Sequence, residues 1–254
     1  MNPILAAMAG IRKAVRRLGF DVVRYNLEPR DVDPSVAETI RVVRPYTMTS
    51  VERLTALAEA VRYIAANEVP GDVVECGVWR GGSMMAIARH LLLASDASRH
   101  LYLFDTFEGM SQPTARDVAF TGETAADLLA RTDRSVADSV WCVAPLQEVE
   151  RNMVSTGYEP ALIHYVKGKV EETIPAAAPK KIALLRLDTD WYESTRHEME
   201  HLYPRLSPGG VLIIDDYGQW QGARQAVEEY FEHQGRRPLL QRVDYTARLA
   251  IKPN

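Results

Sequence analysis

Residues 73–83 read VVECGVWRGGS, an apolar run that passes through three glycines into a segment without helix breakers. This order is typical of a β-strand, a tight turn and an α-helix, the first unit of a doubly wound α/β sheet. We expect the strand at 73–77 and the helix at 83–94, with Ser83 as its N-cap. Glycines between strand and helix let the backbone approach a ligand closely, so this turn is a candidate binding site.

The alternation of apolar runs and helical patterns continues from this unit to residue 233. Further strands are expected at 100–105, 163–167, 182–188 and 211–215, and further helices at 50–67, 193–203 and 222–233. Residues 239–243 and 248–252 flank a turn, which predicts an antiparallel hairpin at the sheet edge. The fold class is therefore α/β: a Rossmann-like, doubly wound, mostly parallel sheet with a C-terminal antiparallel hairpin and an N-terminal helical extension.

The second expected strand ends in LYLFDTF, residues 101–107. Its Asp105 can accept hydrogen bonds from both hydroxyls of a ribose. Trp79 stands where a dinucleotide fingerprint has its second glycine, which disfavours the pyrophosphate of NAD. The pattern suits an adenosine ligand without a pyrophosphate, of which S-adenosylmethionine is the commonest. The alternative makes Gly77 a packing glycine and Asp105 a helix cap.

Two pairs of aspartates follow apolar runs farther along the chain: Asp188 and Asp190 in LRLDTDWY, then Asp215 and Asp216 in GGVLIIDDY. The carboxyl ends of parallel strands are where open α/β sheets bind ligands. Clustered carboxylates without His or Cys are hard oxygen ligands, which suit Mg²⁺, Mn²⁺ or Ca²⁺. Solvated turn residues and helix caps are the alternative, but two such pairs favour a metal site.

Length and composition limit the class of protein. A chain of 254 residues with 46% apolar residues can bury one sizeable core. The formal net charge of -4 argues against a general nucleic-acid surface. Two cysteines are too few for a disulfide framework, and the apolar run 4–11 fits neither a secretory signal nor a membrane span. A cytoplasmic location is expected.

Residues 1–30 carry six Lys and Arg side chains against two Asp and Glu. A basic amphipathic start of this kind could contact an anionic membrane, pack against a second subunit or stay solvated, and we favour packing or solvation. Residues 108–140 are rich in polar groups and interrupt the alternation, which predicts a lid insertion. A homo-oligomer is expected.

Several motifs together resemble the macrocin and mycinamicin O-methyltransferase family. They are Glu75-x-Gly77-x-Trp79-x-Gly81-Gly82-Ser83, Asp105-Thr106-Phe107, LRLDTDWY and the Asp215-Asp216 pair. The runs YTM at 46–48, GKVEETIP at 168–175 and YPRLSPGG at 203–210 also look like family signatures. More distantly, the chain is similar to the metal-dependent caffeoyl-CoA and catechol O-methyltransferases.

The resemblance implies a methyltransferase that uses S-adenosylmethionine and a divalent ion, Mg²⁺ or Mn²⁺, to methylate a hydroxyl, typically on a deoxysugar of a natural product. Residues 68–254 would form the methyltransferase domain and 1–67 a helical cap. Asp188, Asp215 and Asp216 would hold the metal, and Asp190 would be the general base beside Asp188. The implied cofactor contacts are Thr47, Met48, Glu75, Gly77, Trp79, Ser83, Asp105, Thr106 and Lys169.

Three alternatives stay open at this stage. The same site could methylate a phenolic or catechol hydroxyl. An NAD-dependent sugar-modifying oxidoreductase is disfavoured by Trp79 and by the lack of a Tyr-x-x-x-Lys pair after the fourth strand. A non-catalytic binding module would leave four carboxylates gathered without a purpose, at a cost in charge repulsion.

Overall fold

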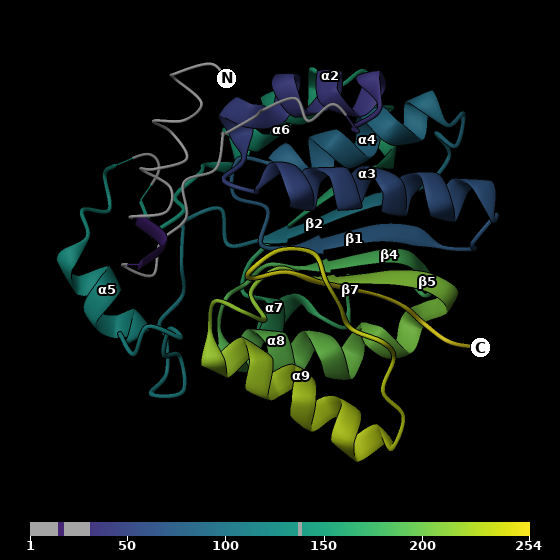
Figure 1. Cartoon of the computed structure of the whole chain (residues 1–254). Coiled ribbons are helices and arrows are strands. Elements are labelled where there is room, and N and C mark those ends of the chain that lie inside the picture. The colour runs from purple at the N-terminus through teal and green to yellow at the C-terminus, as the bar shows by residue number, and fades with distance from the viewer. Residues whose placement is uncertain (1–14, 18–30, 137–138) are drawn as a thin grey trace, which may run out of the picture.

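The computed structural model describes residues 15–17, 31–136 and 139–254 (Figure 1). Its centre is a seven-stranded sheet in the order β3-β2-β1-β4-β5-β7-β6. The strands are β1 (Asp72–Cys76), β2 (Leu101–Asp105), β3 (Ile163–Lys167), β4 (Ile182–Leu187), β5 (Leu206–Ile214), β6 (Gln241–Arg242) and β7 (Arg248–Ile251). β1 to β5 are parallel, and β7 runs antiparallel to β5 and to β6. The predicted mostly parallel sheet with a C-terminal antiparallel hairpin is confirmed.

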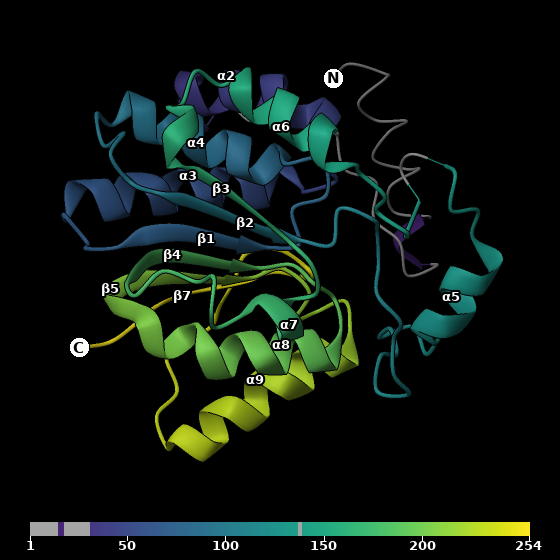
Figure 2. The same ribbon diagram turned by 180° about the vertical axis from the view of Figure 1, so that it is seen from behind.

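Helices cover both faces of the sheet, as Figures 1 and 2 show. One face carries α2 (Pro34–Val43), α3 (Val51–Ala66), α4 (Gly82–Leu93) and α6 (Leu146–Val154); the other carries α7 (Val170–Thr173), α8 (Tyr192–His201) and α9 (Gln221–Gln234). α5 (Ala125–Arg131) stands off to one side. Three short 3-10 turns complete the order: η1 (Arg44–Tyr46), η2 (Pro160–Leu162) and η3 (Tyr203–Arg205).

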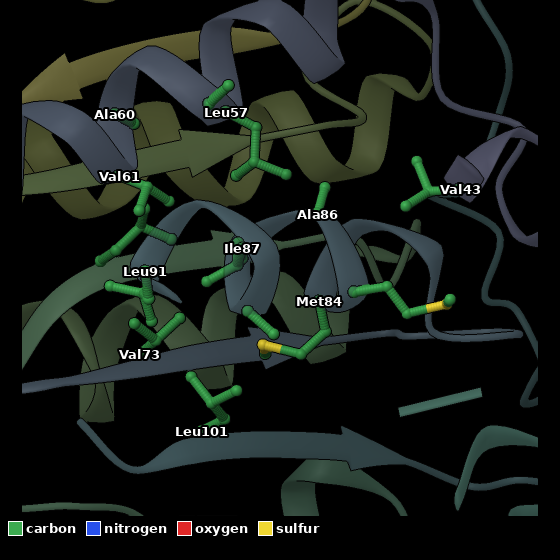
Figure 3. Close-up of a cluster of buried hydrophobic side chains, with 14 of the residues drawn as sticks. Val43, Leu57, Ala60, Val61, Val73, Met84, Ala86, Ile87, Leu91 and Leu101 are labelled. Atoms are coloured by element: carbon green, nitrogen blue, oxygen red, sulfur yellow. The ribbon is translucent and has the colours of Figure 1, made fainter. Parts of the chain in front are cut away.

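Buried apolar side chains join each helical layer to the sheet. In Figure 3, Leu57 and Val61 of α3 lie near Ile87 and Leu91 of α4, which in turn lie above the sheet. The second core, between the sheet and α8 and α9, contains Met199 and Val227 among others. Burial of such side chains stabilises the fold by about 1.5–3 kcal/mol each. β4 and most of β1, in the middle of the sheet, are thus buried on both faces, whereas β3, at its edge, is only partly buried.

The structure differs from the sequence predictions at three places. No helix was predicted between residues 30 and 49, but α2 lies there; it begins after Asp33, whose carboxylate accepts the Ser35 N–H at 2.8 Å. The N-cap of α4 is Gly81, with φ 84°, rather than Ser83, because the turn needs a left-handed residue there. β5 starts at Leu206, and a register shift against β4 takes up the Ser-Pro-Gly-Gly segment before Val211.

The remaining expectations concern the N-terminus and the insertion. The basic stretch 1–30 lies outside the described residues, apart from 15–17. Within the described part of the chain, no helix has the length and apolar character needed to cross a bilayer. Residues 108–136 and 139–140 run along the carboxyl edge of the sheet and bond to the turns there, at Gln219 and Tyr192. Their role as a lid stays a prediction.

Candidate active site

A cleft lies at the carboxyl ends of the five parallel strands, and its space, including the open mouth, is about 1090 Å³. Every parallel strand contributes lining residues from the turn that follows it. Among the predicted site residues, the lining includes Thr47, Met48, Gly77, Trp79, Ser83, Asp105, Thr106, Lys169, Asp188, Asp190, Asp215 and Asp216.

Asp105 holds the glycine-rich turn in place. Its Oδ2 accepts the N–H groups of Val78 at 2.7 Å and Trp79 at 3.0 Å, and its Oδ1 accepts the N–H of Phe107 at 2.7 Å. A carboxylate has about four acceptor sites, so about one is left for a ligand. While these bonds persist, Asp105 can accept a hydrogen bond from one ribose hydroxyl, not from both as the sequence pattern predicted.

The segment after α2 covers the start of α4. A Cβ atom at Gly82 would lie 2.5 Å from the carbonyl oxygen of Tyr46, so only glycine allows this approach. Arg80 ties the two segments together, because its Nη1 donates to the Pro45 carbonyl at 2.9 Å while its Nε pairs with Glu148. Thr47 and Met48 therefore reach the cleft at the glycine turn.

Asp188, Asp215 and Asp216 form a compact carboxylate group. One oxygen from each lies within 4.8 Å of the others. Burial raises the pKa of Asp188 and of Asp216 well above the usual range, and the neighbouring carboxylates add to the effect. Three crowded hard-oxygen donors of this kind fit a divalent cation, whose charge would relieve the repulsion.

Two arginines also belong to this group, and the sequence analysis did not find them. Arg186, on β4 and only 2% exposed, donates from Nη1 to Asp188 at 2.7 Å and from Nη2 to Asp215 at 2.7 Å. Arg53, on α3, pairs with the other oxygen of Asp215 and with Asp244. A basic residue inside the apolar run of β4 was a usable signal for Arg186. Arg53 has no such signal, since charged residues are ordinary on a helix surface.

Glu75 is the one predicted cofactor contact that does not line the cleft. It is 1% exposed, and its carboxylate pairs with Arg186. Burial raises its pKa to about 7, against the opposing effect of Arg186. The structure therefore gives Glu75 Oε1 a partner within the core, while its Oε2 is buried without a partner among the described residues.

Asp190 faces the cleft from a tight turn. Asp188 and Asp190 both line the cleft, but they are not alternate residues of one strand, because β4 ends at Leu187 and Asp190 has φ 65°, a left-handed conformation that Asp tolerates. Its Oδ1 accepts the indole N–H of Trp220 at 2.7 Å. The pKa of Asp190 is raised to about 7, chiefly by burial and next by Asp188, which suits a base at neutral pH.

The sheet order, with an antiparallel strand between β5 and β6, and the glycine-rich turn above a cleft at the carboxyl edge define a Rossmann-like methyltransferase. The family is that of the macrocin O-methyltransferases (TylF), whose family model matches residues 34–250, and the chain belongs to it. It is therefore an O-methyltransferase, and the predicted family is confirmed.

Individual relatives agree with this assignment. The chain is 35% identical over 222 residues to the 8-demethyl-8-(2,3-dimethoxy-alpha-L-rhamnosyl)-tetracenomycin-C 4'-O-methyltransferase of Streptomyces olivaceus, covering 87% of this chain and 81% of that enzyme. It is 35% identical over 191 residues to the mycinamicin III 3''-O-methyltransferase of Micromonospora griseorubida, covering 75% and 72%. The solved structure of the O-methyltransferase NovP matches with a TM-score of 0.70 and 30% identity, covering 82% and 83%.

Proposed function

We propose that this chain transfers a methyl group from S-adenosylmethionine to a sugar hydroxyl of a glycosylated natural product, with the help of a divalent cation such as Mg²⁺. The observation that carries the proposal is the shared cleft. The glycine-rich turn and the aspartate group open into the same space, so a methyl donor and a bound hydroxyl would meet there.

The cleft has the chemistry of a site for a cationic donor. Six carboxylates line it against three cationic side chains, so its potential favours positive ligands such as a sulfonium. The indole N–H of Trp79 is buried without a partner among the described residues and is available to a ligand acceptor. The N–H groups of residues 78 and 79 are taken by Asp105, which argues against a pyrophosphate at this turn.

The carboxylate group has the chemistry of a metal site. Asp188, Asp190, Asp215 and Asp216 face two guanidinium groups, which also pair with Glu75 and Asp244, so the carboxylates outnumber the cations. In the proposed site Asp188, Asp215 and Asp216 hold the cation, which when bound supplies Lewis-acid polarisation of an acceptor hydroxyl. Arg186 stays beneath the group as a fixed counter-ion.

Asp190 is the proposed general base. Its Oδ1 accepts the indole N–H of Trp220, and its carboxylate takes the proton of the acceptor hydroxyl as the methyl group moves off sulfur. The walls of the cleft hold donor and acceptor in line, which supplies much of the acceleration. Four chain segments position these groups: the turns after β1, β4 and β5, and residues 46–49.

The acceptor class rests on the relatives. The tetracenomycin enzyme is named for a rhamnosyl group and the mycinamicin enzyme for position 3'' of mycinamicin III. A deoxysugar acceptor follows for this chain as part of the proposal. A panel of rhamnosides and of catechols, assayed by mass spectrometry with S-adenosylmethionine and Mg²⁺, separates this acceptor from the phenolic alternative.

The experiment that tests the proposal is calorimetric titration of S-adenosylmethionine and S-adenosylhomocysteine, in EDTA and in Mg²⁺. We expect micromolar binding by the wild type and at least tenfold weaker binding by Asp105→Ala. Asp133→Ala is the matched control, because Asp133 also accepts a backbone N–H, from Ser135, but on the exposed insertion. Binding of NAD in place of S-adenosylmethionine would refute the assignment of the cofactor.

A further inference from the structure

Asp117 is a fully buried carboxylate in the insertion, and the proposed reaction leaves it without a role. It is 0% exposed. Its Oδ1 accepts the N–H of Tyr192 at 2.7 Å, and its Oδ2 accepts the N–H and the hydroxyl of Thr114 at 2.6 and 2.9 Å. A buried charge persists only when hydrogen bonds satisfy it, so these bonds are needed to keep Asp117 in the core.

The bond to Tyr192 makes Asp117 a cap supplied from another part of the chain. α8 begins at Tyr192, directly after the Asp188–Trp191 turn, and its N-cap Trp191 provides no side-chain cap. The free N–H groups and the dipole at a helix N-terminus favour a carboxylate. Asp117 fills this position, so the insertion holds the end of the turn that carries Asp190.

Tryptophans connect the same insertion to the same turn. The indole N–H of Trp191 donates to the carbonyl of Ser111 at 3.1 Å, and Trp191 packs edge-on against Trp220 with ring centroids 5.0 Å apart. Trp220 in turn donates to Asp190 and forms a β-bridge with Ala119. Residues 109–111 line the cleft, so one wall of the cleft and the base share a single frame.

We propose that Asp117 is a positioning residue: it holds the segment 109–119, whose residues 109–111 line the cleft, onto the start of α8 and thereby fixes Asp190 toward the acceptor. The proposal rests on the proposed role of Asp190. Residues 109–111 are then a preformed part of the acceptor site.

The first test uses Asp117→Ala, with Asp127→Ala as the matched control. Asp127 accepts the hydroxyl of Thr124 at the start of α5, in the same insertion but away from α8. We expect Asp117→Ala to lower kcat 10- to 100-fold on an acceptor from the panel, because a shift of about 1 Å in a reacting group can cost 100-fold. The KM for S-adenosylmethionine should stay within twofold, and Asp127→Ala should keep kcat within twofold.

Hydrogen–deuterium exchange gives a readout that needs no acceptor. The amides of residues 190–195 should exchange faster in Asp117→Ala than in the wild type or in Asp127→Ala. If no acceptor of the panel is methylated, the proposed function fails. The exchange result still shows whether Asp117 holds the turn that carries Asp190 in place. Unchanged kcat, or unchanged exchange at 190–195, would overturn the positioning role.

Gly222→Ala tests the same contact from α9 without altering Asp117. A Cβ atom at Gly222 would lie 2.5 Å from the Oδ1 of Asp117, on the oxygen that receives the Tyr192 N–H. Helix propensity alone, which favours alanine, predicts an equal or higher melting temperature and full activity, whereas the close contact requires the Asp117 carboxylate to shift. We expect a fall in kcat of at least tenfold. Wild-type kcat in Gly222→Ala would overturn the proposal, even if Asp117→Ala does not fold.

Discussion

Replacing Trp220 by phenylalanine should move the pH dependence of the reaction. The change removes the indole N–H that Asp190 accepts at 2.7 Å and keeps an aromatic ring in the position. A donor to a carboxylate favours its charged form, so the Trp220 bond lowers the pKa of Asp190 against the raising effects of burial and Asp188. Its loss should therefore raise that pKa above its present value of about 7.

The size of the shift follows from the strength of the bond. A hydrogen bond to a charged group contributes about 1.5–3 kcal/mol, and 1.36 kcal/mol corresponds to one pKa unit. Taking the lower end, the pKa of Asp190 rises from about 7 to about 8. A base works unprotonated, so at pH 7 the active fraction falls from about one half to about one eleventh, roughly fivefold. At pH 9 both forms are more than about 90% ionised, and the difference nearly vanishes.

Initial rates of methyl transfer between pH 5.5 and 9.5, with saturating S-adenosylmethionine and Mg²⁺, measure this shift. Trp191→Phe is the control, since it removes the neighbouring indole N–H, which donates to Ser111 rather than to Asp190. Its acid limb should stay in place even where its kcat is lower. An acid limb that does not move in Trp220→Phe, or that moves equally in Trp191→Phe, would refute the assignment of Asp190 as the base.

Further predictions concern the core and the metal site. His90 is 1% exposed, and burial is the main reason that its pKa is lowered to about 4. Between pH 6.5 and pH 4 the unfolded chain therefore binds more protons than the folded protein, so the free energy of unfolding decreases as the pH is lowered. From pH 7 to pH 5 the free energy of unfolding, measured with urea, should decrease by about 2 kcal/mol more in the wild type than in His90→Leu. Equal decreases in the two proteins would contradict this prediction. Gly77→Ala would place a Cβ atom 2.0 Å from the Asp188 carbonyl oxygen, whereas Gly157→Ala meets the same left-handed φ in open space. Gly157→Ala should lower the free energy of unfolding by about 1–2 kcal/mol. Gly77→Ala should lower it by at least about 2 kcal/mol more and abolish S-adenosylmethionine binding, and similar unfolding midpoints for the two variants would contradict this prediction. Arg53→Gln removes a cation that pairs with Asp215. Calorimetry should therefore show Mg²⁺ binding about fivefold tighter than in the wild type, which corresponds to about 1 kcal/mol. Weaker binding would mean that Arg53 orders the site instead.

The parallel strands and the carboxylate group could be predicted because their signals are local. β4 and the end of β5, residues 210–214, are buried on both faces, which requires largely apolar runs, and Asp188 and Asp215 follow these runs directly. Pairs of acidic residues at the ends of adjacent parallel strands must meet at one edge of the sheet. No knowledge of distant contacts is needed for either inference.

Among the described helices that were not predicted, α2 has clear signals in the sequence and α6 has weak ones. α2 starts with Asp33 and Pro34, a cap followed by a residue suited to the first turn, and buries Val36, Ile40 and Val43 at helical spacing. α6 buries only Val149 and Met153. Its other positions are mostly polar and charged, so its apolar stripe is too narrow to stand out from a polar segment.

The partners of the site could not be predicted because tertiary packing sets them. Arg53 and Asp215 are 162 residues apart, and Asp117 and Tyr192 are 75 apart. Nothing in the residues around Asp117 distinguishes a buried cap from a polar loop, since Asp favours both. Such contacts depend on where the insertion crosses the sheet edge, which periodicity does not encode.

The carboxyl edge of this sheet shows how binding and stability are coupled. Gathering Asp188, Asp190, Asp215 and Asp216 at this edge costs free energy, first because burial disfavours the charged forms and second because the carboxylates repel one another. The pKa increases at Asp188, Asp190 and Asp216 record both costs. Arg53 and Arg186 offset part of it, and Asp215 has both oxygens paired with them. Full compensation by arginines would leave no attraction for a cationic ligand. The two guanidinium groups instead leave a residual negative charge that a divalent cation and a sulfonium can match, so the ligands of the proposed reaction would complete the electrostatics of the core.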